Sequence, residues 1–204
     1  MTKIMLHRGD LPADLSLGPI VAIDTEAMGL NPVRDALCVV QLSSGDGSAH
    51  VVQLTRDYDC PNLKALLADP AVLKVFHFAR FDLAMVRKWL GVVCAPVWCT
   101  KIASKLARTY TDRHGLKDVT RELVGVSMDK SQQSSDWGAP NLTDQQLSYA
   151  ASDVLHLHKI REGLLTMLER EGRLGLAQSC FDFLPVRAEL DLGGWDGVDI
   201  FAHS

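Results

Sequence analysis

The strongest constraint on the fold is an apolar run that ends in two closely spaced acids. Residues 19–23, PIVAI, are short, continuous and rich in β-branched side chains, as in a strand buried on both faces. Asp24 and Glu26 follow directly, and two acids separated by one residue project to the same side of an extended chain. Because α/β proteins place their sites where buried strands end, this run predicts a functional edge of a sheet.

Further apolar runs predict strands that alternate with helices. Besides residues 19–23, strands are expected at 37–42, 49–54, 73–78 and 97–100, with the turn-forming SSGDGS making a hairpin of 37–42 and 49–54. Helices are expected at residues 62–68 and 79–90, and two further helices should end near residues 108 and 124. A last helix should begin at the capping-box pair Thr143 and Gln146 and run to about residue 168. This order predicts an α/β fold, a ribonuclease-H-like mixed sheet flanked by helices, although periodicity alone also allows a flavodoxin-like sheet.

The composition narrows the function classes. A chain of 204 residues that is 47% hydrophobic can build one domain with a core. The net charge of −4 argues against non-specific attraction to long nucleic acid, so any such contact should be local and short. The sequence contains no apolar run of about 18 residues, so no membrane association is expected. Its five cysteines are scattered without a CxxC pair, which predicts neither disulfides nor structural zinc and favours the cytoplasm.

A third acid, Asp82, falls in the helix expected at residues 79–90. It lies on or beside an apolar stripe formed by Phe78, Phe81, Met85 and Trp89. An acid on such a face must be paired or must bind a metal. The alternative to a metal ligand is a salt bridge to Arg80, Arg87 or Lys88.

A fourth acid, Asp153, follows Tyr149 by four residues in the late helix. This spacing places both side chains on one helix face, and the small residues between them allow close packing against a sheet. Taken alone, the pair could be an aromatic side chain at the core margin beside a capped acid. Together with Asp24, Glu26 and Asp82, however, it completes an oxygen-ligand cluster of the kind that Mg²⁺ and Mn²⁺ prefer.

Several longer motifs resemble a known enzyme family. The segments VAIDTEAMGL, FHFARFDL, KSQQSSDW and LSYAASDVLHLH resemble the DEDDy 3′→5′ exonucleases, of which ribonuclease D is the best known. The segment TKIASKLARTYTDRHGLKD and the end of the chain from CFDFLP onward are similar to the nano-RNase C family, stand-alone oligoribonucleases of alphaproteobacteria. The resemblance implies the DEDD exonuclease fold over residues 1–184, a tail over 185–204 docked on its own or a neighbouring subunit, and no HRDC domain.

The resemblance also implies the catalytic machinery. It makes Asp24, Glu26, Asp82 and Asp153 the ligands of two divalent cations, Mg²⁺ or Mn²⁺. Asp24 would bridge both ions, Glu26 and Asp153 would serve the ion that carries the attacking water, and Asp82 would serve the second. Tyr149 would orient that water, since a phenol with a pKa near 10 is a poor base at neutral pH. The products would be nucleoside 5′-monophosphates.

Contacts with substrate are expected from two further segments. Met28, Gly29 and Leu30 follow the first acids, and the resemblance makes Leu30 an apolar wedge against the terminal bases; packing beneath the loop is the alternative. His77 is a candidate phosphate or ribose contact, or else a satisfied core histidine. The next residue is Phe78 where the family usually has Asn, so a polar contact is missing there.

A basic segment supplies the remaining candidates. Residues 100–121 carry six Lys and Arg against two Asp in a chain of net charge −4. The candidates for phosphate binding are Arg108, Arg113, His114 and Lys117. The alternative is a solvated helix face. The QSSDW segment, with Gln133, Ser135, Asp136 and Trp137, is expected to shape the loop near the site, with Trp137 in the core.

The leading hypothesis is therefore a metal-dependent 3′→5′ exoribonuclease that degrades very short RNA, with dinucleotides preferred. Trimming of longer or structured RNA 3′ ends, as by ribonuclease D, or a DNA 3′→5′ exonuclease activity would use the same five residues. A non-catalytic RNA-binding scaffold is a third reading, but such a protein would be expected to lose some ligands. The resemblance further implies a homo-oligomer, specifically an octamer.

Overall fold

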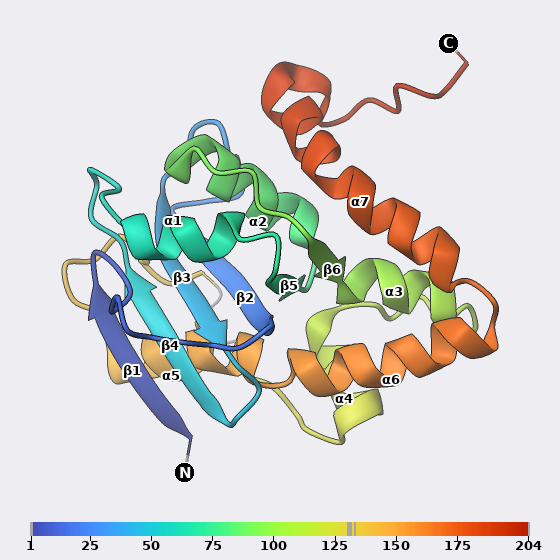
Figure 1. Cartoon of the computed structure of the whole chain (residues 1–204), viewed down its shortest axis with the longest axis horizontal. Coiled ribbons are helices and arrows are strands. Elements are labelled where there is room, and N and C mark those ends of the chain that lie inside the picture. Colours follow the sequence, from blue (N-terminus) through green and yellow to red (C-terminus); the bar gives the residue numbers. More distant parts are fainter. Residues whose placement is uncertain (1, 130–131, 133, 204) are drawn as a thin grey trace.

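A six-stranded mixed sheet forms the centre of the protein, as the computed structural model in Figure 1 shows. The structure describes residues 2–129, 132 and 134–203. The strand order is β1-β4-β3-β2-β5-β6, with antiparallel pairing around β3 and parallel pairing elsewhere. The strands are β1 (Lys3–Arg8), β2 (Ile20–Ala27), β3 (Leu37–Ser43), β4 (Ser48–Gln53), β5 (Leu73–Phe76) and β6 (Val97–Cys99). The predicted α/β fold with a mixed sheet is confirmed.

Helices cover both faces of this sheet and extend beyond β6. Figure 1 shows α1 and α2 on one face, α5 on the other, and α3, α4, α6 and α7 at the β6 end. The helices are α1 (Pro61–Ala68), α2 (Ala79–Met85) continued by the wider turn η1 (Val86–Leu90), α3 (Thr100–Ala107), α4 (Leu116–Val124), α5 (Asp144–Leu155), α6 (Leu157–Arg170), and α7 (Leu174–Leu190) continued by the turn η2 (Asp191–Trp195). The expected capping box begins α5, because the Thr143 hydroxyl accepts from the Gln146 backbone and the Gln146 side chain accepts from Thr143.

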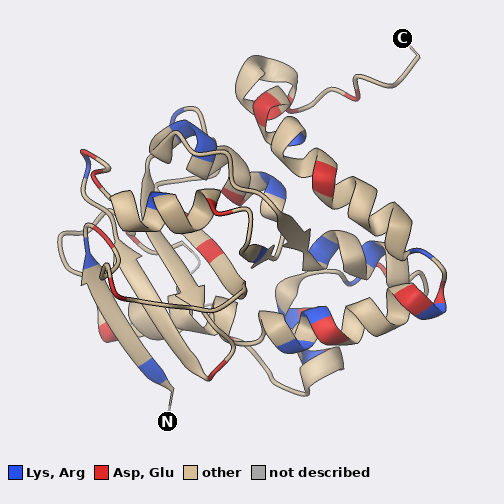
Figure 2. Cartoon of the chain, in the orientation of Figure 1, with Lys and Arg blue, Asp and Glu red and all other residues tan. Residues whose placement is uncertain are grey.

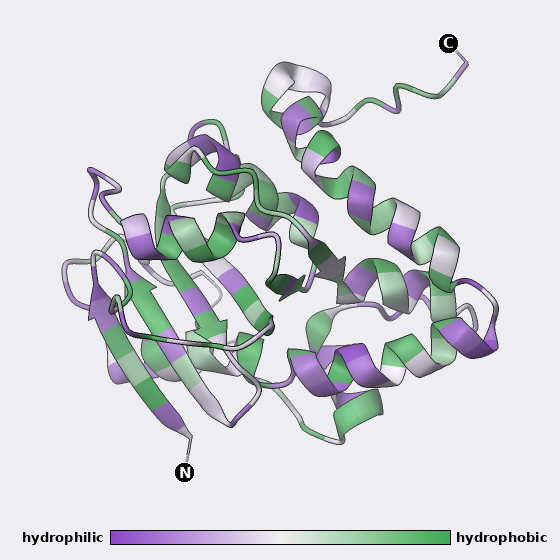
Figure 3. Ribbon diagram, in the orientation of Figure 1, coloured by the Kyte–Doolittle hydropathy of each residue, from purple (hydrophilic) through white to green (hydrophobic). Residues whose placement is uncertain are grey.

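Burial on both faces explains why the central strands are continuous apolar runs. Val21, Ala22 and Ile23 of β2 are completely buried, and every residue of β3 is buried. Figure 3 shows these strands as mainly hydrophobic, whereas the helices alternate hydrophobic and hydrophilic faces. The sheet therefore holds any polar side chain on β2 or β3 in a fixed position.

Two elements differ from the sequence expectation. Strand β1 was not predicted; it is an edge strand, parallel to β4, and its apolar run is only three residues long and only partly buried. The single helix expected from Thr143 to about 168 is two helices, which part at His156 (φ −105°, ψ −7°). Helix α5 packs on the sheet and α6 packs on α3, so the chain changes direction while buried residues such as Val154 and Leu157 continue the apolar pattern.

The C-terminal segment is tied to the rest of the protein through Asp191. The boundary expected at residue 184 falls inside α7, which continues through Pro185 to Leu190. Beyond it, the Asp191 carboxylate accepts hydrogen bonds from Arg80 (2.6 and 2.7 Å) and from Arg187 (2.5 and 3.0 Å). Both guanidinium groups also donate to backbone carbonyls of residues 195–198. We call residues 191–198 the C-terminal hook.

Candidate active site

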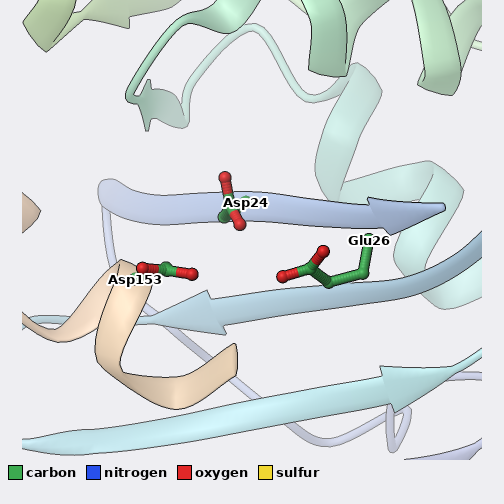
Figure 4. Close-up of side chains that lie close together, drawn as sticks. All are labelled: Asp24, Glu26 and Asp153. Carbon is green, nitrogen blue, oxygen red and sulfur yellow. The ribbon is translucent and has the colours of Figure 1, made fainter. Parts of the chain in front are cut away.

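Three carboxylates converge where β2 meets α5. Oxygen atoms of Asp24, Glu26 and Asp153 all lie within 4.8 Å of one another. Figure 4 shows the Glu26 and Asp153 side chains pointing toward each other beside Asp24. Strand alternation explains the pair on β2, and the packing of α5 over β2 brings Asp153 to it. We call these three residues the acid cluster.

Asp82 lies next to the acid cluster but is held from the other side of β2. It is buried, and its carboxylate accepts a hydrogen bond of 2.6 Å from the Thr25 hydroxyl. Thr25 lies between Asp24 and Glu26, so its side chain points to the opposite face of β2. The salt bridges considered as alternatives do not form with the two arginines, because Arg80 pairs with Asp191 and Arg87 with Glu189.

Two positioning residues were missed by sequence reasoning. Gln41 of β3 is directly opposite Asp24 in register, is completely buried, and donates to the Asp24 carboxylate at 3.0 Å. Thr25 fixes Asp82 in the same way. The available signal was a Gln inside the otherwise apolar LCVVQL run, since a buried amide requires a polar partner.

Burial and mutual repulsion dominate the electrostatics of the site. Burial raises the pKa of Asp24 well above its usual range, and the charges of Asp82, Asp153 and Glu26 raise it further. Burial also raises the pKa of Glu26, and the charges of Asp153 and Asp82 raise it further. Burial also raises the pKa of Asp82, although the Thr25 hydrogen bond opposes this. Carboxylates in this arrangement remain ionised together only beside a cation.

The donor set fits a divalent metal ion. All ligand atoms are carboxylate oxygens, which hard cations such as Mg²⁺ choose over the histidine and cysteine sites of softer metals. Asp24, Glu26 and Asp153 are close enough to share one ion. The charge of Asp82 raises the pKa of Asp24, and the charge of Asp153 raises the pKa of Asp82, so Asp82 interacts electrostatically with this group. The acid cluster could therefore hold a divalent cation.

Tyr149 lies one helical turn before Asp153 on α5. Its ring is half-buried and lies against Trp137, with ring centroids 6.0 Å apart. Burial raises the pKa of the Tyr149 phenol, and the charges of Asp153, Glu26 and Asp24 raise it further. The phenol is thus neutral at physiological pH and can donate a hydrogen bond beside the acid cluster. Trp137 is buried in the core, as expected, whereas Gln133 of the same motif lies outside the described residues.

The loop after β2 presents Leu30 to solvent. The Leu30 side chain is 87% exposed, which removes the alternative that it packs beneath the loop. Gly29 lies against Asp35, because a Cβ at Gly29 would be 2.3 Å from an Asp35 carboxylate oxygen. Met28 packs on Gly138, where a Cβ would lie 2.4 Å from the Met28 sulfur. The loop is therefore closely packed at Gly29, Met28 is half-exposed beside Gly138, and Leu30 projects into solvent.

His77 directly follows β5, the parallel neighbour of β2. Its Nδ1 is 2.8 Å from the Thr100 hydroxyl, which also donates to the Phe76 carbonyl. The ring is half-buried. The structure thus fixes His77 at the same sheet edge as the acids.

The basic candidates separate into one buried residue and a surface group. Arg108 is completely buried, and its guanidinium bonds to the Glu122 carboxylate, the Ser104 hydroxyl and the Arg113 carbonyl. It joins α3 to α4 and has no surface to offer a phosphate, which corrects the expectation for this residue.

His114 is half-buried, with Nδ1 2.9 Å from the Ser104 hydroxyl. Arg113 and Lys117 are exposed. Figure 2 shows basic positions on α3 and acidic colouring on β2, in different parts of the fold.

Comparisons with known proteins agree with this geometry. The sequence profile described as 3′-5′ exonuclease matches residues 10–169. Ribonuclease D of Gluconacetobacter diazotrophicus is 40% identical over 156 residues, which cover 76% of this chain and 39% of that protein. The chain thus spans well under half the length of this relative.

Two solved structures extend the comparison. NrnC of Brucella melitensis is 56% identical, with a TM-score of 0.96 and coverage of 100% of both chains; it has also been solved with bound Mg²⁺ and bound to pGG. Ribonuclease D of Escherichia coli, an exoribonuclease involved in structured RNA processing, is 29% identical with a TM-score of 0.74, over 84% of this chain and 45% of that one. The resemblance found from the motifs is confirmed, and the chain belongs to the 3′-5′ exonuclease family that includes ribonuclease D and NrnC.

Proposed function

We propose that this protein hydrolyses very short RNA from its 3′ end, with dinucleotides preferred, and releases nucleoside 5′-monophosphates. The observation that carries the proposal is the acid cluster, with three carboxylates within 4.8 Å of one another on β2 and α5. Asp82 and Tyr149 interact electrostatically with these acids, which supports a shared role for the five residues implied by the sequence motifs. The relative NrnC, solved with pGG, supports the preference for short RNA.

The cofactor we infer is a pair of divalent cations, Mg²⁺ or Mn²⁺. Asp24, Glu26 and Asp153 would hold one, and Asp82 together with Asp24 would hold the other. When bound, such ions supply a reactive water near neutral pH and stabilise the negative charge on the departing oxygen. The bound Mg²⁺ of the NrnC relative supports the choice of metal.

The other residues of the site position the reactants. The neutral phenol of Tyr149 orients the attacking water by donating or accepting a hydrogen bond. Gln41 holds the Asp24 carboxylate and Thr25 holds Asp82, so neither acid must reorganise during the reaction. The exposed Leu30 separates the terminal bases, with Met28 and Gly29 fixing its loop. His77, Arg113, His114 and Lys117 remain our candidates for phosphate or ribose contacts.

A second function shares this machinery. Trimming of longer or structured RNA 3′ ends would use the same five residues, and the likeness to the ribonuclease D of Escherichia coli supports it. The two functions differ in the length of RNA that is degraded fastest, which the experiment below measures.

We further infer a homo-oligomer, specifically an octamer, that works in the cytoplasm. Four apolar side chains near the C-terminal hook are 44–78% exposed, namely Trp195, Val198, Ile200 and Phe201, and their burial between subunits would remove them from water. All five cysteines are unpaired thiols, which suits a reducing compartment. Among the described residues, no helix combines the length and the apolar character needed to cross a membrane.

The decisive experiment is a time course with 5′-labelled RNAs of two, three, five and seven residues. Each RNA is incubated with Mg²⁺, with Mn²⁺ and with EDTA. We expect the two-residue RNA to disappear fastest and EDTA to stop the reaction. Laddering of the longer RNAs with the dinucleotide left over would favour ribonuclease D-like trimming. If no RNA is degraded with Mg²⁺ or with Mn²⁺, both proposed functions are refuted.

A further inference from the structure

Phe78 adopts a backbone conformation that its side chain does not favour. Its φ of 69° and ψ of 42° lie in the left-handed region, which costs a bulky residue free energy that Gly or Asn largely avoids. The side chain is also 44% exposed, so burial in the core does not compensate for this cost. Strained residues of this kind concentrate where a protein binds a ligand, and the aromatic ring of Phe78 is the group being displayed.

The ring is held in place by Lys101 of α3. The Lys101 ammonium lies 4.2 Å from the centroid of the Phe78 ring, within the range of a cation–π interaction. The positively charged ammonium group of Lys101 therefore covers one face of the Phe78 ring. Such a pairing offers a flat surface for stacking and a cation for an anionic group at the same point.

Phe78 also lines a cavity of about 300 Å³ between the start of α2, α3 and α7. Its apolar wall is completed by Ile102 from α3 and by Phe183 and Leu184 from α7. This volume is at the small end of the range for small-molecule sites, and it matches a single nucleotide better than a longer ligand.

The charged side chains that line this cavity are all basic. They are Arg80, Lys101, Lys105 and Arg187, and none of the described lining residues is acidic, in a chain of net charge −4. Arg80 and Arg187 are already bonded to Asp191 of the C-terminal hook. Lys101 and Lys105, one turn apart on α3, enter no ion pair among the described residues. Two ammonium groups without an acidic partner, one of them over an exposed ring, suit a phosphate attached to a flat base.

The cavity is connected to the acid cluster through the chain itself. Phe78 directly follows His77, which the structure fixes beside β2, and it precedes by one turn the Asp82 of the same helix. A ligand held against Phe78 therefore lies next to the segment that carries two of the site residues.

We propose that this cavity binds one nucleotide, with its base stacked on Phe78 and its phosphate between the ammonium groups of Lys101 and Lys105. The inference rests on the proposed function for the class of ligand, while its geometry involves none of the acid cluster. The nucleotide has two possible sources, a residue of the RNA being degraded or a free nucleoside 5′-monophosphate. Both present the same base and phosphate to the cavity.

The test is the binding of AMP to the full chain in EDTA, measured by isothermal titration calorimetry. EDTA prevents turnover, so the result does not depend on catalysis. Phe78→Asn removes the ring and suits the left-handed backbone; we expect it to weaken AMP binding by about tenfold, the loss of one base-stacking contact. Lys101→Ala combined with Lys105→Ala should weaken it by about tenfold or more through the lost charge. The matched control Lys88→Ala, an exposed lysine on η1, should leave it unchanged.

Two further ligands separate the contributions. Adenosine should bind more weakly than AMP and be insensitive to the lysine substitutions, whereas inorganic phosphate should be insensitive to Phe78→Asn. AMP binding that is absent in EDTA, or equal in the wild type and both variants while their melting temperatures are unchanged, would overturn the inference. Loss of fold in one variant still leaves the other to decide.

Steady-state kinetics with the dinucleotide then identify the source. If the cavity holds a nucleotide of the RNA, AMP competes with RNA and Phe78→Asn raises the KM for RNA in proportion to its effect on AMP. If it holds a free nucleotide, AMP changes kcat at saturating RNA and Phe78→Asn removes that change. Either pattern supports the site. A protein that binds AMP through Phe78 and yet degrades no RNA would contradict the proposed function alone.

Discussion

Asp191 is a buried carboxylate and the acid cluster is partly buried, but their neighbours carry opposite charges. Asp191 lies between the guanidinium groups of Arg80 and Arg187, whereas Asp24, Glu26 and Asp153 face one another. Burial raises the pKa of Asp24, and its neighbours add to that effect. For Asp191, burial acts in the same direction, but the hydrogen bonds and charges of the two arginines outweigh it and lower the pKa.

The difference separates a stabilising carboxylate from a functional one. The negative charge of Asp191 is compensated within the protein by two arginines. Removing this carboxylate would leave Arg80 and Arg187 without the acid that both of them bind. In the acid cluster, the charges of the neighbouring acids act in the same direction as burial, so their repulsion favours the uptake of protons or of a cation. A chain that keeps such a cluster gives up stability in exchange for metal binding. The two sites should therefore respond in opposite ways to mutation.

The largest effect is expected from Asp24→Asn. The amide keeps the shape of the side chain but removes one of the three clustered charges, so RNA hydrolysis should fall by about 1000-fold or more. The free energy of unfolding without metal should stay the same or rise, because one like charge has been removed. Single-turnover rates and urea denaturation in EDTA measure the two quantities. A clear loss of stability would show that the cluster is structural.

Metal addition should stabilise the wild type and expose the same contrast. Mg²⁺ at about 100 times its dissociation constant should raise the free energy of unfolding by about 2.7 kcal/mol, because it binds only the folded cluster. The Asp24→Asn variant should lose this response, and a variant of Asp191 should retain it. Thermal denaturation with and without EDTA gives the answer. Equal responses in all three proteins would place the metal elsewhere.

Asp191→Asn should lower stability and leave the chemistry intact. The substitution weakens charge-assisted hydrogen bonds from two arginines, so the free energy of unfolding should fall by about 1–3 kcal/mol. Because Asp191 is not a member of the acid cluster and is bonded to Arg80 and Arg187 instead, the rate per folded molecule at saturating RNA and 25 °C should change less than about threefold. Urea denaturation and single-turnover rates are the measurements, with Asp182→Asn, an exposed acid of α7, as control.

The pH dependence of that stability has a definite sign. The folded pKa of Asp191 is below its unfolded value, so its contribution is complete above about pH 5 and is lost as the pH falls through about 3.9 toward the lower folded pKa. The difference in free energy of unfolding between the wild type and Asp191→Asn should therefore shrink over this range. A difference that stays constant from pH 7 to the acid range would mean that the arginines do not lower this pKa.

Local geometry explains which parts of the site were predictable. Asp24 and Glu26 share a face because the strand backbone makes side chains alternate between two faces. Tyr149 and Asp153 share a face because the helix backbone repeats about every four residues. Arg108 was misjudged because a run of basic residues does not reveal which of them turns inward; its partner Glu122 lies on the following helix, and the pairing depends on how α3 meets α4. Sequence spacing thus predicts faces within an element.

Contacts between elements were the part that sequence could not supply. The break at His156 leaves the apolar pattern unbroken, and the pairing of β1 with β4 joins segments more than 40 residues apart. The hydrogen bond from Thr25 to Asp82 likewise crosses from β2 to α2. Each depends on packing of the whole sheet, which a single sequence does not display as a local pattern.

The smallest predicted effect concerns Gln41, which acts on the acid cluster through its side-chain amide. Gln41→Met keeps the buried volume nearly constant but removes the donor to Asp24, so the rate should fall by about tenfold and the Mg²⁺ concentration for half-maximal rate should rise. A purely structural residue would change stability and leave the metal dependence alone. The matched control is Gln53→Met, a buried glutamine on β4 that donates to the Ala139 carbonyl at 2.9 Å, away from the cluster. Both variants lose the hydrogen bonds of a buried glutamine side chain, so the difference between their metal titrations isolates what Gln41 does for the acid cluster. If the two titrations coincide, Asp24 needs no positioning, and the acid cluster is held by the sheet alone.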